Sequence, residues 1–165
     1  MSELNPIQEK VRKQVRNPWK FGLFLFLKVP MGFIAGMRIV DLSASKCVTS
    51  VPFKFLTKNP FKSMYFAVQA MAAELSTAAT CMLAVQGQKP SIAYIIVDCK
   101  AQFKKKATAK VFFTCDDVEQ AFIAVEKCKT DDNPQLVTFT TIGKMADGTE
   151  VAEFKFTWSF KRRQS

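Results

Sequence analysis

One acidic side chain, Glu74, occupies a setting in which a carboxylate could do chemistry. It is the single charged residue between Ser63 and Gln88, a run rich in Ala, Met, Leu and Val. Neither Gly nor Pro interrupts this run before Gly87, so the pattern predicts one long helix that is apolar on most sides. A carboxylate there must be paired with a cation or a hydrogen-bond donor, be protonated, or take part in the function of the protein. Burial would raise its pKa toward the value that a general base needs near neutral pH.

The sequence contains no histidine, and this absence removes whole classes of chemistry. Ser-His and Cys-His triads and imidazole-based metal sites are excluded, so catalysis would depend on carboxylates, hydroxyls, amides and backbone dipoles. The five cysteines are widely spaced without a CxxC pair, which favours buried reduced thiols over zinc ligands or disulfides. The first ten residues show no secretory signal, and we expect a cytoplasmic protein with no metal site.

A net charge of +10 favours anionic partners, although each basic cluster can also be an ordinary solvated surface. The clusters lie at 10–16, 104–106 and 161–163. Nucleic acid, anionic lipid and a phosphorylated ligand all fit this charge. No nucleic-acid reader motif is present, so we expect no nucleic-acid partner. The apolar run at 21–27 is too short to span a bilayer, and we expect no transmembrane segment.

Alternating apolar residues and turn signals predict a chain of mixed strands and helices. Asp117 and Gln120 form a candidate capping box for a short helix, and Asp147-Gly148 is a favoured hairpin turn. The last strand alternates, with Phe154, Phe156, Trp158 and Phe160 expected to point inward. The expected strands are 37–42, 47–56, 91–103, 110–115, 135–145 and 149–160, preceded by an amphipathic helix at 4–16.

This order of elements predicts the fold class. One-sided strands favour an antiparallel sheet with a solvated face, and a helix that is apolar on most sides needs a curved sheet around it. We therefore expect an α+β hotdog fold, in which a curved antiparallel sheet wraps one long central helix. The length fits a single domain over 1–165. Residues 1–30 are expected to form a helical segment packed on it, with a membrane-surface role as the alternative for this basic, Phe-rich end.

The segment before the central helix carries a family resemblance. Asn59-Pro60-Phe61-Lys62-Ser63-Met64-Tyr65, with Glu74 nine residues after Tyr65, resembles the hotdog-fold thioesterase-like proteins. It is most similar to a poorly characterised branch with the pattern Asn-x-Phe-x-Ser-Met-His and an acidic residue nine further on. Tyr65 stands where many relatives have His, and Phe66-Ala67 stands where they have a Gly-containing pair. The likeness extends over about residues 30–160.

The resemblance implies roles for the matching residues. Glu74 would be the general base or nucleophile toward an acyl thioester, and Asn59 an orienting residue. The stretch from Ser63 through Tyr65 to Phe66 would be the oxyanion end, where backbone N–H groups polarise the carbonyl. Apart from the resemblance, Gln69 lies one to two turns before Glu74 and could orient water, and Ser63 is a candidate helix N-cap. Lys104, Lys105 and Lys106 suit the phosphates of coenzyme A or of a carrier-protein pantetheine arm, as part of the substrate rather than as a cofactor.

Spacing along the helix constrains how these residues could act together. Nine residues separate Tyr65 from Glu74, about 13 Å along a helix axis, which is too far for both to act on one carbonyl. A two-fold homodimer with antiparallel central helices would bring the helix start of one chain near Glu74 of the other, and two dimers could form a tetramer. We therefore expect an acyl-CoA or acyl-carrier thioester hydrolase. The alternative is a non-catalytic protein that binds acyl-CoA or fatty acid in the same tunnel.

Overall fold

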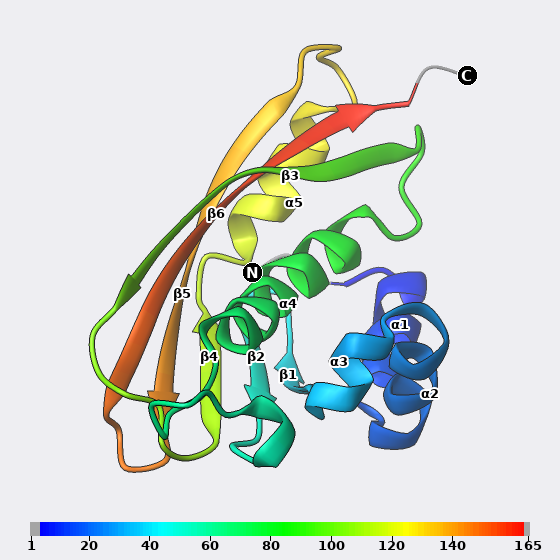
Figure 1. The fold of residues 1–165 in the computed structure, drawn as a ribbon. Helices are drawn as coiled ribbons and strands as arrows, with labels where there is room; N and C mark the ends of the chain where they lie inside the picture. Colours follow the sequence, from blue (N-terminus) through cyan, green and yellow to red (C-terminus); the bar gives the residue numbers. More distant parts are fainter. Residues whose placement is uncertain (1–3, 164–165) are drawn as a thin grey trace.

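The computed structural model describes residues 4–163 and shows a six-stranded antiparallel sheet curved around one long helix, α4 (Phe66–Val85) (Figure 1). The order of strands across the sheet is β1-β2-β4-β5-β6-β3. The α+β class and the curved sheet around a central helix, both predicted from the sequence, are therefore confirmed. The strands are β1 (Arg38–Leu42), β2 (Cys47–Val51), β3 (Ile92–Phe103), β4 (Val111–Cys115), β5 (Gln135–Met145) and β6 (Glu150–Arg162).

Small side chains let α4 lie close against the concave face of the sheet. Two polar contacts tie the helix down: Ser76 Oγ donates to Thr141 Oγ1 at 2.8 Å, and Trp158 Nε1 donates to Thr77 Oγ1 at 3.0 Å. Buried hydroxyls need such partners, because an unpaired polar group in the core is costly. The small buried residues of α4 include Ala72, Ala73, Ser76, Thr77, Ala79 and Thr80.

The contact between Trp158 and the helix gives a stability prediction. Trp158→Phe keeps an aromatic ring in the core but removes the donor to Thr77, so we expect a loss of about 1 kcal/mol in the free energy of unfolding. Urea denaturation followed by circular dichroism measures the change. Trp19→Phe is the matched control, because Trp19 is 89% exposed and should change stability little. Equal losses of stability in the two variants would contradict a stabilising role for the hydrogen bond from Trp158 to Thr77.

Most strand predictions hold, including the final hairpin. Gly148 has a φ of +83° in the turn between β5 and β6, and all four aromatic residues predicted to point inward from the last strand are buried. Strand β2, however, ends at Val51 rather than at residue 56. Pro52 has no N–H for the sheet, and a 3₁₀ turn, η1 (Phe55–Thr57), follows it.

The capping box predicted at Asp117 and Gln120 is wrong. Helix α5 (Glu119–Lys127) begins after Val118 and has no side-chain cap. The Asp117 carboxylate instead accepts the backbone N–H of Thr140 at 2.9 Å, which ties the start of α5 to strand β5. The predicted apolar face of this helix is nevertheless buried, at Val118, Ala121, Phe122 and Val125.

Three helices precede the sheet and lie together on its β1 side, next to α4 (Figure 1). They are α1 (Pro6–Arg16), α2 (Pro18–Lys28) and α3 (Pro30–Ala35). Each begins with a proline, whose fixed φ suits the first helical position. Asn5 and Asn17 cap α1 and α2 by accepting backbone N–H groups. The sequence predicted a helix at 4–16 within a helical segment over 1–30, but not the bounds of α2 and not α3.

Within residues 4–163, α4 is the one helix that is long and apolar enough to cross a membrane by length and composition. More than half of it, 56% of its most apolar 18-residue window, is buried inside the protein. The curved sheet accounts for that burial, so α4 is the core helix of this fold.

Candidate functional site

Most of the predicted site residues line one hollow where the chain enters α4. It has a volume of about 690 Å³ and lies between the loop before the helix and the loop after β3. The residues of the first loop and of the helix start are Asn59, Ser63, Tyr65, Phe66 and Gln69. Those of the second loop are Lys104, Lys105 and Lys106, preceded by Phe103 at the end of β3. We call this cavity the loop hollow.

Asn59 shapes the loop that leads into α4. Its Oδ1 accepts the N–H of Phe61 at 3.0 Å, the N–H of Ser63 at 3.2 Å and the hydroxyl of Ser63 at 3.3 Å. Ser63 is buried in this network and is not the helix N-cap, so that prediction is wrong. The N-cap is Tyr65, which makes no side-chain cap. The side-chain oxygen of Asn59 therefore holds the loop in place through these hydrogen bonds.

Free backbone donors remain at the start of α4. The N–H of Tyr65 donates to the carbonyl of Thr57 at 2.8 Å and is therefore already used. The N–H groups of Phe66 and Ala67 have no acceptor among residues 4–163, and the first turn carries no acidic side chain. Such groups lie at the positive end of the helix dipole and favour a carbonyl oxygen or an anion. The candidate donors are thus Phe66 and Ala67, so the free donors begin at the last residue of the expected stretch from Ser63 to Phe66.

Gln69 carries an unsatisfied acceptor beside these donors. The residue is 4% exposed, and its Nε2 makes only a long 3.4 Å bond to the carbonyl of Met64. Its Oε1 is buried and has no donor among the described residues. A buried acceptor without a partner costs free energy, so this oxygen is ready to accept from a water or a ligand N–H.

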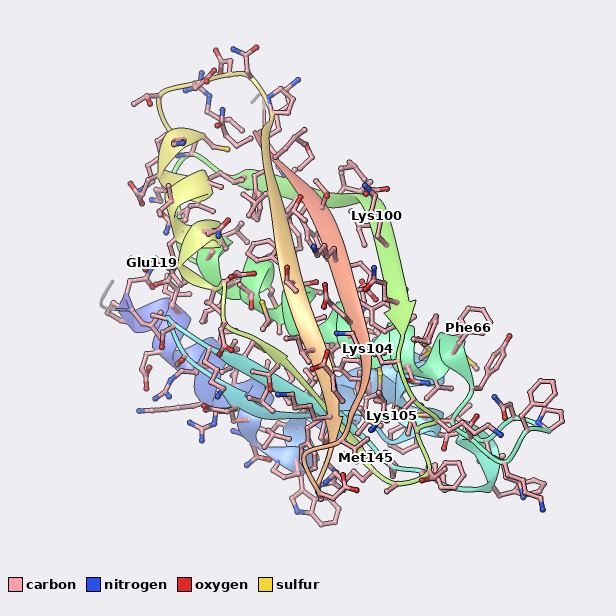
Figure 2. The ribbon with its side chains drawn as sticks, turned by 90° about the vertical axis from the view of Figure 1, so that its left-hand side faces the viewer. Phe66, Lys100, Lys104, Lys105, Glu119 and Met145 are labelled. Carbon is pink, nitrogen blue, oxygen red and sulfur yellow. The ribbon has the colours of Figure 1, made fainter. Side chains whose placement is uncertain are left out.

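Aromatic rings form the rim of the loop hollow. The rings of Tyr65 and Phe66 meet edge to face with centroids 5.0 Å apart, and Phe66 also contacts Phe103 at 6.3 Å. Phe66 is 55% exposed and points outward from the start of α4 (Figure 2). The donors of the helix start are therefore approached past a large apolar side chain.

The three lysines do not contribute equally to the charge of this hollow. Lys104 pairs with Glu150 and, at 3.4 Å, with Glu153, and the hydrogen bond to Glu150 raises the pKa of its ammonium group. Lys106 Nζ donates to the Phe61 carbonyl at 3.4 Å. Lys105 makes no ion pair with any residue from 4 to 163. Positive charge for an anionic group thus comes mainly from Lys105 and Lys106.

Glu74 lies in a separate cavity between α4 and α2. This cavity, the acid hollow, has a volume of about 290 Å³, and the carboxylate makes no ion pair and no side-chain hydrogen bond within residues 4–163. Burial raises the pKa of Glu74 above its usual range. Apolar side chains dominate the walls, among them Phe21, Phe24, Leu25, Ile39 and Met71, with Tyr94 of β3 as a further neighbour.

Solved structures with the same architecture are numerous, although no family model and no curated protein matches the sequence. One is a Pseudomonas aeruginosa protein of unknown function described as a probable thioesterase (14% identity, 91% of this chain and 99% of that chain, TM-score 0.75). Another is a thioesterase from Haemophilus influenzae (10% identity, 88% of this chain and 91% of that chain, TM-score 0.65). A third is a mutant thioesterase from Pseudomonas aeruginosa (13% identity, 86% of this chain and 92% of that chain, TM-score 0.65). The chain has the hotdog fold. At these identities the likeness shows the fold alone.

Within this hotdog fold, the predicted site residues fall into two groups. Glu74 lines the acid hollow, and every other predicted site residue lines the loop hollow. Sequence analysis missed Phe21, Leu25 and Tyr94 beside the acid. Phe21 and Leu25 are four residues apart and are the buried pair of α2, a spacing that could have revealed a helix face turned toward the protein.

Proposed function

We propose that the protein hydrolyses acyl thioesters at a site shared between two copies of the chain. The observation that carries the proposal is Glu74, an acid with a raised pKa and without a partner among the described residues, in an otherwise apolar cavity. A partly buried carboxylate without a partner is costly, and burial shifts its pKa upward, the direction that favours proton abstraction near neutral pH. Thioesterases that share the fold, and the resemblance of the segment from Asn59 to Tyr65, support the same reaction class.

The proposed chemistry divides between the two hollows. The thioester carbonyl accepts hydrogen bonds from the N–H groups of Phe66 and Ala67, which stabilise the oxyanion that develops during attack. Gln69 Oε1 accepts a hydrogen bond from one O–H of the attacking water, which keeps that hydrogen. Glu74 of the second copy removes the other proton as the water oxygen bonds to the carbonyl carbon. Collapse of the oxyanion breaks the C–S bond, and the protonated Glu74 returns its proton to the leaving sulfur.

A direct attack by Glu74 is the other route that the same geometry supports. The carboxylate would displace the thiolate and form an anhydride, which water then hydrolyses. Both routes need the thioester carbonyl at the start of α4 in one copy and Glu74 from the other copy. Both therefore require a dimer.

Features of β3 support a two-fold dimer. Among residues 4–163 the strand pairs only with β6, so within that part of the chain its other edge leaves backbone groups unpaired over 12 residues. Cys99, Ala101 and Phe103 lie opposite buried residues of β6 and face the same side of the sheet, yet all three are exposed. A second copy added at this edge would cover them. Tyr94 of this strand lines the acid hollow together with Glu74, and burial there raises the pKa of its hydroxyl.

We propose coenzyme A or a pantetheine arm as the leaving group. Lys105 and Lys106 at the edge of the loop hollow can bind phosphate oxygens, with coenzyme A as part of the substrate and no separate cofactor. The acyl chain would then extend toward the apolar walls around Glu74.

Release of free thiol from a panel of acyl-CoA thioesters of increasing chain length tests this function. We expect turnover by the purified protein that rises with pH as Glu74 loses its proton. Absence of turnover with every substrate would contradict hydrolysis.

A second candidate function has one specific observation in its favour. Phe66 stands exposed at the donors of the helix start, where the related branch has a Gly-containing pair, and it narrows the approach of a carbonyl. A protein that binds acyl-CoA or fatty acid without hydrolysing it would tolerate this side chain. Saturable binding of an acyl-CoA without thiol release would decide for that function.

A further inference from the structure

Helices α2 and α3 present an unusually apolar surface. Only Phe21 and Leu25 of the large side chains on α2 are buried, and most of the others point away from the protein. Trp19 is 89% exposed and Phe26 58% exposed. Contiguous exposed apolar surface of this kind marks an interaction site in a folded protein. The exposed residues that define this surface, which we call the N-terminal patch, are Trp19, Leu23, Phe26, Leu27, Phe33 and Ile34.

The patch is a formed surface rather than a set of scattered side chains. The rings of Phe26 on α2 and Phe33 on α3 contact edge to face at 5.4 Å, which holds the two helices together. A groove of about 630 Å³ runs between the helices, with Trp19 and Leu23 also on its wall. Figure 1 shows α2 on the outer side of this helix group, away from the sheet.

Charge around the patch is mainly positive, although Glu9 pairs with Arg12 and Lys13, and Asp41 pairs with Arg16. From residue 10 to residue 40 the sequence carries seven basic residues and no acidic one. Lys20 and Lys28, at the two ends of α2, make no ion pair within residues 4–163. Basic residues that flank an apolar helix face, with a Trp among the apolar residues, are the features of helices that lie in the interface of an anionic bilayer.

The positive charge also discriminates between two possible partners of the patch, a second copy of the chain and an anionic lipid surface. A second copy seated on this patch by two-fold symmetry would bring each basic segment against its twin, and like charges would oppose the contact. An anionic lipid surface instead meets the lysines with opposite charge while it buries the apolar side chains. We propose that α2 and α3 bind the surface of an anionic membrane through the N-terminal patch, without spanning it.

This surface adjoins the acid hollow. Phe24 is half-exposed on α2 and also lines the cavity that holds Glu74, as does the buried Leu25. Membrane binding would therefore place the lipid surface beside the apolar walls of that cavity. The proposal does not depend on hydrolysis, because its test measures binding alone.

Sedimentation of the full chain with lipid vesicles tests the proposal. We expect binding to mixed phosphatidylcholine–phosphatidylserine vesicles, weak binding to pure phosphatidylcholine, and loss of binding as salt rises. Trp19 fluorescence should shift to shorter wavelength on binding, while the buried Trp158 stays unchanged. Absence of binding to the mixed vesicles would overturn the proposal.

Substitutions separate the apolar contribution to vesicle binding from the electrostatic one. The double variant Trp19→Ala/Phe26→Ala should weaken the partition coefficient at least about tenfold, because it removes two exposed apolar anchors. Lys20→Gln/Lys28→Gln should weaken it by about tenfold on mixed vesicles and much less on pure phosphatidylcholine. Circular dichroism shows that each variant is folded.

Matched controls lie elsewhere on the molecule. Leu136→Ala removes an exposed apolar side chain from β5, and Lys127→Gln removes an exposed charge from α5. Neither should change vesicle binding, and an equal loss in these controls would overturn the assignment to the patch. Gel filtration supplies the other decisive outcome. If Trp19→Ala/Phe26→Ala converts a dimer to a monomer, the patch binds a second copy and the membrane proposal is wrong.

Discussion

Replacing Glu74 by Gln should reduce kcat/KM for acyl-CoA hydrolysis by about a thousandfold. The amide has nearly the same shape as the acid but cannot accept a proton from water. Substrate binding should be largely kept, because the apolar walls around position 74 are unchanged. Thiol release measured over a range of substrate concentrations separates the two effects, and the loss should lie mainly in kcat.

Glu119→Gln is the control for this substitution. Glu119 is an exposed carboxylate at the start of α5, on the opposite side of the molecule from Phe66 (Figure 2). Removing it changes net charge in the same way without touching either hollow, so activity should stay near that of the unmodified protein. Retention of full activity in Glu74→Gln would exclude the carboxylate from the chemistry.

The same acid predicts opposite effects of pH on activity and on stability. As pH rises through the raised pKa of Glu74, the base form accumulates and kcat/KM should increase. The folded protein holds this proton more tightly than the unfolded chain does. Stability should therefore fall as pH rises from the unfolded-state pKa of Glu, about 4.3, to the folded-state value. Glu74→Gln should lack this fall, which urea denaturation across that pH window would measure.

The central helix and its sheet were predictable because local pattern and tertiary environment agree there. An uncharged run without Gly or Pro gives α4, and a strict two-residue alternation gives β6. Within the helical segment expected over 1–30 the bounds of α2 were not predicted, and α3 was missed, because residues 18–35 are apolar on nearly every side and give no helical periodicity. Their prolines and the Asn17 cap were the available signals.

The candidate site was only partly predictable, because contacts between distant segments decide it. Lys104 pairs with Glu150 and Glu153 since β3 lies beside β6 in the sheet, and no local pattern reveals that pairing. The acid hollow exists because side chains of α2 and α4 face each other across it. The unsatisfied Oε1 of Gln69 follows from burial by the loop before the helix, which spacing along the sequence cannot give.

Gln69→Leu should lower kcat/KM by about a hundredfold without lowering the free energy of unfolding. The substitution removes a buried acceptor that has no partner among residues 4–163, together with one long 3.4 Å bond from Nε2 to the Met64 carbonyl. An apolar group of similar size replaces both, so the net effect on stability should be neutral or stabilising. Activity and stability would thus respond in opposite directions. Gln102→Leu, at an exposed position of β3, is the control and should leave activity unchanged. A marked loss of stability in Gln69→Leu would mean that its amide has a structural role.

Mixing the two inactive chains tests whether the site is shared. If Glu74 of one copy serves the helix start of the other, a hybrid dimer of Glu74→Gln and Gln69→Leu chains has one site with both defects and one with neither. Random assembly makes half of the dimers hybrid, so co-expression should restore about a quarter of full activity. A site contained in one chain would leave every active centre defective, and no activity would return. This experiment therefore locates the acid relative to its substrate without requiring a structure of the complex.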